Sequence, residues 1–484
     1  AMNKRILFSV IVLLALFCLG SLTVLCITTG VLWQNGLQSS PTPLTNLITE
    51  AVTARQATAT PAAPTAIPAI TAEETPSPSA TKQPSAEDAA ILKQMEQIEQ
   101  QVAALRGLPP IEPVKRRLMN SEELRKHVEE NFLKDYTAEE AAQDARVLSI
   151  YGLLNSDYDL YGLYLELYSE QVAGFYDSET KEMYVVQGGT FGGMERSTYA
   201  HEFTHALQDQ HYNLREGLKI NPDYCKEDSE YCAAVQALIE GDASLTEQYW
   251  LYQHGTVQDR GDIEAFYANY SSPVLDSAPS FLREDFAFPY REGVDFVLTL
   301  FQKDGYNAID AAFANPPLST EMILHPEKYP NDRPAAISLP QFTSLLNRPL
   351  SELDRGVMGE WYTYLILAHG VQENWRIADE LARQAAAGWQ GDAYAVFWDE
   401  TARQPVMALL SEWETERDAG EFRQAFTAYA RLRWGEADQQ DLQRGWLWQE
   451  TEDGVVFFQQ RGNQTLWLIV PREADLPLLK PSGW

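Results

Sequence analysis

The sequence is poor in basic residues, and it lacks several common catalytic motifs. Lysine and arginine number 37 against 69 aspartate and glutamate, which gives a net charge of −32 over 484 residues. Because nucleic-acid affinity rests largely on cationic neutralisation of phosphates, this balance argues against DNA or RNA as a partner. We also find no phosphate-binding glycine loop, no Gly-x-Ser-x-Gly elbow and no cysteine in a nucleophile context. Other chemistry must therefore be sought.

Cysteine is scarce, and the four that are present form two pairs of different character. Cys18 and Cys26 lie in an apolar run, and neither follows the small residue that a lipoprotein cleavage site needs. Cys225 and Cys232 lie in a polar stretch. We expect a disulfide between this second pair if the folded part occupies an oxidising compartment, and two separate thiols otherwise.

The N-terminus carries a long uncharged run over residues 6–33, rich in Leu, Val, Ile and Phe. This run is longer than the roughly 20 residues that a helix needs to cross the hydrocarbon core of a bilayer. Lys4 and Arg5 precede it, which favours a cytoplasmic location for residues 1–5 and an extracytoplasmic one for everything after the span. The run predicts a single-pass membrane anchor at the cell membrane. A cleaved signal peptide is the alternative, although its apolar region would be shorter.

Composition divides the rest of the chain. Residues 34–88 are rich in Pro, Thr, Ala and Ser, and such a segment buries too little apolar surface to fold. We expect an extended stalk there, which would hold the folded part off the bilayer. A catalytic domain is predicted over residues 89–345, followed by a helical and α+β region over residues 346–484. Their 45% hydrophobic content is sufficient for packed cores.

The folded part mixes helical and strand patterns, which predicts an α+β fold: a predominantly helical domain with a small mixed sheet, and a small C-terminal α+β module. Apolar steps of three and four over 92–105 predict a helix that packs on the next domain, with a coiled coil less favoured. Alternation over 172–186 predicts a β-hairpin, followed by a glycine-rich loop over 188–193. Residues 350–369 are expected to be helical, and strands around a helix at 418–431 are expected near the end.

The run His201-Glu202-Phe203-Thr204-His205 is the clearest chemical signal. Residues four apart share a helix face, so His201 and His205 can present both imidazoles to one tetrahedral zinc ion. Zinc activates a bound water and polarises the scissile carbonyl, while Glu202 takes the water proton and passes it to the leaving amine. The pattern predicts a zinc metallopeptidase. Two surface histidines on an ordinary amphipathic helix are the alternative.

A catalytic zinc ion is bound by three protein ligands, and two residues are candidates for the third. One is Glu240; the other is His211, which completes the spacing HExxHxxGxxH. At about 100° per residue, His211 points away from His201 unless the helix breaks, and Gln208 stands where a glycine would break it. We therefore favour Glu240. Asp242 is expected to make a local salt bridge rather than to orient a ligating histidine.

Four segments together resemble a family of bacterial membrane-anchored proteins regarded as zinc metallopeptidases. These segments are residues 171–177 (QVAGFYD), 201–212 (HEFTHALQDQHY), 237–243 (ALIEGDA) and 318–329 (LSTEMILHPEKY). The resemblance covers roughly residues 105–329. It implies a zincin-like fold of the gluzincin type with Glu240 as third ligand, but it supplies no substrate.

The last of these segments adds His325 as a candidate catalytic residue. Gluzincins use a distal histidine or tyrosine to stabilise the oxyanion of the tetrahedral intermediate, which points to His325, with Tyr329 as a weaker alternative. A structural histidine hydrogen-bonded ahead of Pro326 is the competing interpretation. In zincins a strand upstream of the metal helix pairs with the extended substrate, and residues 175–186 are the candidate here.

The sequence as a whole predicts a membrane-anchored, extracytoplasmic zinc metallopeptidase with Zn²⁺ as cofactor and a peptide or protein as substrate. The rival hypothesis is a non-catalytic envelope protein that keeps the scaffold for binding or assembly. The intact Glu202 argues against it, because a binding scaffold has no chemical need for the base. A sensor or inhibitory role for the C-terminal module is a third hypothesis.

Overall fold

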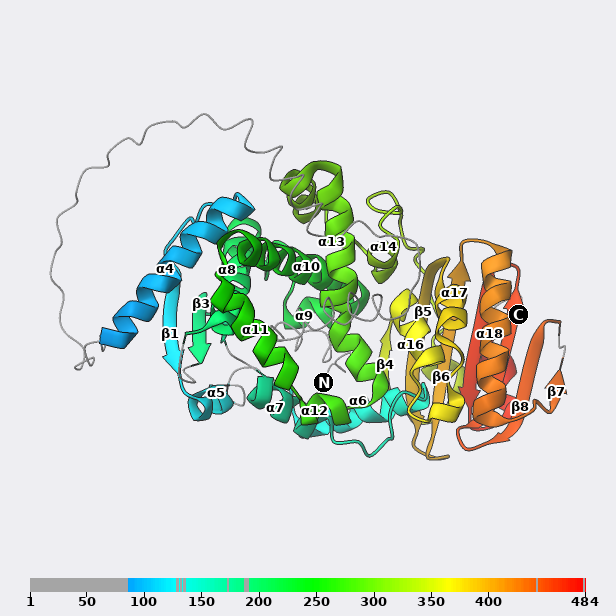
Figure 1. The fold of residues 1–484 in the computed structure, drawn as a ribbon. Coiled ribbons are helices and arrows are strands. Elements are labelled where there is room, and N and C mark those ends of the chain that lie inside the picture. Colours follow the sequence, from blue (N-terminus) through cyan, green and yellow to red (C-terminus); the bar gives the residue numbers. More distant parts are fainter. Residues whose placement is uncertain are drawn as a thin grey trace.

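The computed structural model describes residues 86–127, 130, 133, 136–171, 174–186, 191–440, 443–481 and 484. These residues form an α+β fold, as predicted, with a three-stranded sheet and a seven-stranded sheet. The two sheets lie at opposite ends of the molecule, with the long helices α10 (Ser229–His254) and α13 (Ser280–Ala314) between them (Figure 1).

The other helices described are α4 (Ala86–Arg106), α5 (Ser121–His127), α6 (Ala138–Ile150), α7 (Leu160–Gln171), α8 (Gly193–Tyr212), α9 (Pro222–Cys225), α11 (Val257–Asn269), α12 (Pro273–Ser277), α14 (Thr320–Leu324), α15 (Phe342–Leu346), α16 (Gly359–Ala368), α17 (Asp379–Ala386), α18 (Glu416–Trp434) and α19 (Leu476–Leu479), with short 3-10 helices η3 (Glu373–Trp375) and η4 (Glu473–Asp475). The strands are β1 (Lys115–Met119), β2 (Gly174–Asp177), β3 (Glu182–Val186), β4 (Leu350–Gly356), β5 (Trp389–Asp399), β6 (Gln404–Trp413), β7 (Gln439–Gln440), β8 (Gly445–Thr451), β9 (Gly454–Arg461) and β10 (Gln464–Val470).

The structure does not agree with the prediction of a membrane-spanning helix. Among the residues that the structure describes, no helix is both long enough and apolar enough to cross a bilayer. The longest, α10 and α13, carry carboxylates such as Glu240 and Asp285 inside the protein, side chains that are costly in lipid. The predicted span at 6–33, with residues 1–5 and the stalk up to residue 85, lies outside the described residues. The prediction of a membrane-spanning helix is therefore wrong for the part of the chain that the structure describes, and with it the predicted cell-membrane location.

The small sheet contains parallel and antiparallel strands, and its last strand in the sequence precedes helix α8, which carries the histidines. Strands β2 and β3 form the predicted antiparallel hairpin, and β1 pairs with β3 in parallel. Phe175 and Tyr184 stack across the hairpin with ring centroids 4.7 Å apart. Gly188 and Gly189 of the predicted loop lie outside the described residues, and α8 begins just after them at Gly193. Strand β2 of the hairpin packs on α8.

Helix α4 packs on α8, as the sequence predicts for its apolar stripe. Met95, Ile98 and Val102 are buried in one cluster with Phe203 and Leu207 of α8. Burial of this stripe against the protein's own core leaves no apolar seam for the alternative coiled coil.

Helices α10 and α13 cross at very close range beside Glu240. A Cβ added to Gly241 of α10 would lie 2.3 Å from the carbonyl oxygen of Gly293 of α13, and one added to Gly293 would lie 2.2 Å from that of Ala237. Only glycine allows the two backbones to approach so closely. Because Gly241 follows Glu240 directly, the crossing fixes the position of that carboxylate.

We expect Gly241→Ala to lower the free energy of unfolding by about 1–3 kcal/mol, because one backbone must move to accept the new methyl group. Chemical denaturation monitored by circular dichroism would measure this loss. Gly261→Ala in α11 is the matched control: a Cβ there meets nothing within 4 Å, so the variant should be unchanged or slightly more stable. Equal stability of Gly241→Ala and the wild type would contradict the close crossing.

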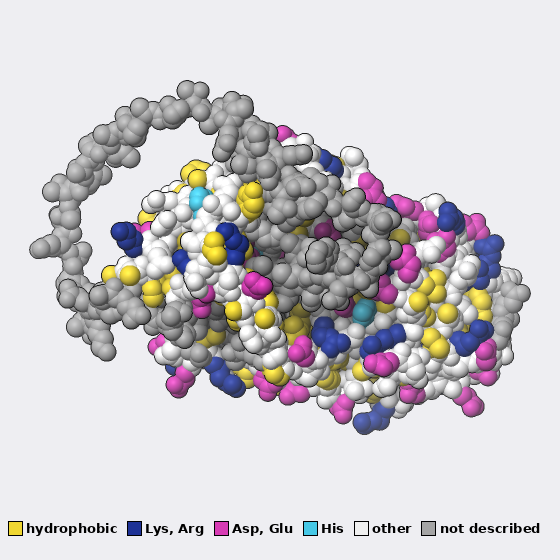
Figure 2. Space-filling view, viewed as in Figure 1, with side chains coloured by type: hydrophobic (Ala, Val, Ile, Leu, Met, Phe, Trp, Pro, Cys, Tyr) yellow, Lys and Arg dark blue, Asp and Glu magenta, His cyan; other side chains and the backbone are white. Residues whose placement is uncertain are grey.

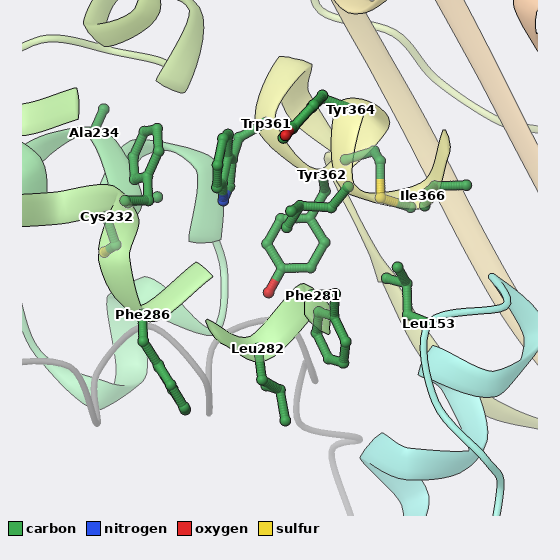
Figure 3. Packing of buried hydrophobic residues seen from close by; sticks show 14 of the residues in the cluster. Leu153, Cys232, Ala234, Phe281, Leu282, Phe286, Trp361, Tyr362, Tyr364 and Ile366 are labelled. Atoms are coloured by element: carbon green, nitrogen blue, oxygen red, sulfur yellow. The ribbon is translucent and has the colours of Figure 1, made fainter. Parts of the chain in front are cut away.

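The hydrophobic core runs without interruption from the helical region into the C-terminal region. One cluster of buried side chains extends from Met119 to Ile469. Figure 3 shows Phe281 and Phe286 of α13 together with Trp361 and Tyr362 of α16, all members of this cluster. Residues on both sides of the predicted boundary at 345/346 therefore share one packed interior.

The C-terminal region forms an antiparallel sheet in the order β4-β5-β6-β10-β9-β8-β7. Helix α18 packs on β6, β9 and β10, so the predicted helix at 418–431 and its flanking strands are confirmed. The prediction of one helix over 350–369 is wrong. Residues 350–356 pair with β5 as an edge strand, and the helix begins only at Gly359, whose φ of +75° makes the turn.

Candidate metal centre

Two neighbouring helices, α8 and α10, bring the three predicted metal ligands to one point (Figure 1). His201 and His205 lie one turn apart on α8, and Glu240 reaches them from the middle of α10. The Oε2 atom of Glu240 is 3.1 Å from Nε2 of His201 and 3.4 Å from Nε2 of His205. All three side chains are buried, and their ligand atoms lie within 4.8 Å of one another. We call these residues the triad.

The separations of Glu240 from the two imidazoles are close to those between the ligands of a zinc ion. Donor atoms at 2.0–2.2 Å from a tetrahedral ion lie about 3.3–3.5 Å from each other, close to the separations between Glu240 and the two imidazoles. Nε2 of His205 is buried, and its contact with Oε2 of Glu240, at 3.4 Å, is long for a hydrogen bond. A buried nitrogen without a good hydrogen bond lowers the stability of the folded protein unless a metal ion binds it. Two imidazoles and a carboxylate leave a fourth position open, as catalytic zinc sites do.

His201 is oriented by a carboxylate that the sequence analysis missed. Its Nδ1 lies 3.2 Å from Oε2 of Glu247, and Oε1 of Glu247 accepts a 2.7 Å hydrogen bond from Ser197. An Nδ1–H donated to Glu247 leaves the Nε2 lone pair free to face the triad. Glu247 lies seven residues after Glu240, two turns along the same helix face. That spacing could have identified it.

His205 is oriented by a chain of hydrogen bonds through Gln208. Nδ1 of His205 lies 2.8 Å from Oε1 of Gln208, whose Nε2 donates to Asp242 at 2.8 Å and to the carbonyl of Ile239 at 3.0 Å. These two acceptors fix the orientation of the amide. Asp242 makes a salt bridge, but its partner is not a sequence neighbour as expected: it is Arg106 of α4, whose Nε lies 2.8 Å away. Asp242 also orients His205 indirectly, which we did not expect.

Glu202 lies beside the triad and is held by the edge strand of the small sheet. Its Oε2 accepts a 2.8 Å hydrogen bond from the backbone amide of Tyr176 in β2. The phenol of Tyr176 donates to Asp209 of α8 at 2.9 Å, so the strand is tied to the helix at two points. Burial is the main cause that raises the pKa of Glu202, to about 8. This carboxyl group is therefore poised to exchange a proton near neutral pH.

In the metal-free triad, the imidazoles and the carboxylates shift one another's pKa values. Burial disfavours the imidazolium of His201, but hydrogen bonds to Glu240 and Glu247 outweigh it and raise the pKa of His201 to about 9. Burial opposes ionisation of Glu240 as well, yet the two imidazoles lower its pKa to about 2. A cation at the triad would take the place of these protons, so metal binding should release protons.

His211 lies apart from the triad. Helix α8 continues unbroken to Tyr212, and Nε2 of His211 lies 2.8 Å from the carbonyl oxygen of Pro109. The unbroken helix directs this imidazole away from the other two histidines.

His325 is not brought to the triad either. It ends α14, where its Nε2 lies 2.8 Å from Oε1 of Glu360. Helix α14 contacts α10 through Thr320 and Glu230, and Glu230 precedes Glu240 by ten residues, about 15 Å along the helix. The phenol of Tyr329, the weaker candidate, donates to the carbonyl of Asn315 at 2.8 Å.

The predicted disulfide between Cys225 and Cys232 is confirmed, with a Cα–Cα distance of 5.6 Å. It joins α9 to the first turn of α10. The bridge therefore restrains the loop that leads into the helix carrying Glu240 and Glu247.

We expect Glu247→Ala to weaken zinc binding by roughly 10–100-fold, because His201 loses the partner that sets its tautomer and direction. Competition with a chromogenic zinc chelator would measure the affinity. Glu264→Ala, at an exposed site on α11, is the matched control and should bind zinc as the wild type does. An unchanged affinity in Glu247→Ala would show that the carboxylate does not support the triad.

Comparison with known proteins reaches only part of the chain. A family model described as a domain of unknown function (DUF8575) matches residues 347–480. The match contains no triad residue. It spans the seven-stranded sheet with α16 and α18, close to the predicted C-terminal region at 346–484. No curated protein and no solved structure matches the chain. The functional proposal therefore depends on the chemistry of the triad.

Proposed function

We propose that the protein is a zinc-dependent metallopeptidase whose metal ligands are His201, His205 and Glu240. The observation that supports this most strongly is the buried triad, in which Oε2 of Glu240 lies 3.1 and 3.4 Å from the two imidazoles, with the carboxylate of Glu202 on the same helix as the histidines. Zinc bound there would lower the pKa of a bound water and polarise the carbonyl of a peptide bond. The substrate class is a peptide or protein.

The residues around the ligands have distinct tasks in this proposal. Glu202 is the general base that takes the water proton and returns it to the leaving nitrogen. The amide of Tyr176 holds one of its carboxylate oxygens in place. Glu247 and Gln208 hold the two imidazoles so that both Nε2 atoms face the same point. Each group is thereby fixed before substrate arrives.

A non-catalytic scaffold that binds a metal for assembly is the alternative. Such a protein would need the triad but not Glu202, whose carboxylate here is buried beside the triad and tied to β2. Burying this acid raises its pKa and is costly for folding, which favours a catalytic use.

Removal of the metal tests the proposal. The purified protein is treated with a zinc chelator, dialysed and incubated with a peptide library read by mass spectrometry. We expect cleavage to disappear on chelation and to return when stoichiometric zinc is added, but not when magnesium is added, since magnesium prefers oxygen ligands. Cleavage that survives chelation, or a zinc-loaded protein that cleaves nothing, would contradict it.

A further inference from the structure

A cavity of about 460 Å³ lies between the first turn of α10 and the C-terminal region. The residues of its wall that bear on binding are Lys219, Tyr224, Asp228, Glu230, Tyr231 and Trp389. The disulfide between Cys225 and Cys232 brackets the loop that supplies several of them. Since Glu230 and Glu240 are ten residues apart on α10, the cavity is about 15 Å along the helix from the triad. Its size suits a side chain or a small ligand.

Glu230 is a buried carboxylate on the wall of this cavity, only 6% exposed. Its Oε1 accepts hydrogen bonds from the amide and the hydroxyl of Thr320, at 2.6 and 2.7 Å. Among the described residues, no lysine, arginine or histidine forms an ion pair with it. Burial, with further repulsion from Asp392 and Asp228, raises the pKa of Glu230 to about 8. In the free protein this group therefore holds a proton at neutral pH, and a cation bound beside it would take the place of that proton.

The backbone of Gly359 passes so close to the side chain of Glu230 that this position requires glycine. A Cβ on Gly359 would lie 2.1 Å from Oε2 of Glu230, and Gly359 has a φ of +75°. A side chain at this position would clash with the carboxylate, and the positive φ would strain it as well. The start of α16 is thus built around a buried acid.

Aromatic rings complete the wall. Tyr224 and Tyr231 meet edge to face with centroids 5.5 Å apart, and Trp389 joins them from β5. The ammonium of the exposed Lys219 lies 4.7 Å from the centroid of Tyr224, so this ring already attracts a cation. Aromatic faces beside carboxylates are the chemistry that binds organic cations. The guanidinium group suits such a wall best, because it pairs with a carboxylate and stacks on a ring at once.

We propose that this cavity binds the guanidinium group of an arginine side chain presented on a peptide. The charge of the whole protein supports a cationic ligand: the net charge is −32, and acidic side chains are scattered over the described part of the face seen in Figure 2. The cavity joins the helical region to the region matched at 347–480, so binding there would engage both. The proposal does not depend on the metal chemistry of the triad.

Two probes of equal shape and different charge test this site on the full chain. N-acetyl-arginine amide is the cationic probe, and N-acetyl-citrulline amide is its neutral counterpart. Isothermal titration calorimetry should show at least about tenfold tighter binding of the arginine probe, because a charge-assisted hydrogen bond to a buried carboxylate is lost with citrulline. Equal binding of the two probes, or no binding of the arginine probe, would overturn the proposal.

Substitutions in the wall of the cavity test whether the arginine probe binds there. Glu230→Gln keeps the acceptor for Thr320 and should reduce affinity for the arginine probe about tenfold, whereas Glu216→Gln, exposed and outside the cavity, should not. If Glu230→Gln fails to fold, Tyr224→Leu serves instead, since this half-exposed ring can be removed with less damage and should also weaken binding. Arginine binding that survives both changes, in folded proteins, would place the ligand elsewhere.

Discussion

Replacing Glu240 with alanine is expected to strip the protein of zinc. Its Oε2 is the atom that lies near both imidazoles, and Gln236 donates a 2.9 Å hydrogen bond to its Oε1. Without it only two protein ligands remain, so the loss of affinity should exceed the roughly 10–100-fold typical of residues that merely orient a ligand. Metal analysis of the purified variant, with circular dichroism to check folding, would measure this.

His211→Ala is the control for this experiment. The imidazole of His211 lies against the carbonyl of Pro109, away from the triad, so its removal should leave the zinc content unchanged. The reverse outcome, with zinc lost in His211→Ala and kept in Glu240→Ala, would require a broken helix α8. It would make His211 the third ligand, in the HExxHxxGxxH arrangement.

Glu202→Gln is expected to reduce peptide cleavage by about 10²–10⁴-fold, the range typical of a lost general base. Glutamine retains the size of the side chain and an oxygen that can accept the amide hydrogen of Tyr176, but it cannot take a proton from water. Zinc content and thermal stability should therefore remain near wild-type values while kcat/KM falls. The substrate is a peptide identified in the library screen.

Glu264→Gln makes the same chemical change at an exposed site and should cleave as the wild type does. Full activity in Glu202→Gln would contradict the proposed base. If zinc is lost together with activity, Glu202 acts on metal binding, and its role as a base would have to be abandoned.

The two histidines could be predicted from sequence because their pairing depends on local helix geometry, whereas Glu240, on another helix, was favoured through the family resemblance and the exclusion of His211. His201 and His205 are four apart, and the angular argument against His211 needs only an unbroken helix. The same reasoning applied to the seven-residue spacing would have found Gln208 from His201 and Glu247 from Glu240. Those supporting residues were missed because Asp242 was the only residue weighed as a partner for the second nitrogen of a ligating histidine.

Features that depend on packing between segments far apart in the chain could not be predicted from the sequence. The segment over 350–369 has the composition of a helix, yet pairing with β5 makes its first part a strand. His325 lies in a segment with a recognisable sequence, but contacts of α14 with α10 and α16 decide where it sits. The cavity around Glu230 likewise depends on Trp389 and Gly359, far away in sequence.

The most direct test of the zinc proposal is anomalous diffraction at the zinc absorption edge, from crystals grown with stoichiometric zinc. We predict one strong peak bonded to Nε2 of His201, Nε2 of His205 and the carboxylate of Glu240, at about 2.0–2.2 Å from each. A peak at His211 or His325 instead, or an empty triad in crystals that contain zinc, would contradict the account.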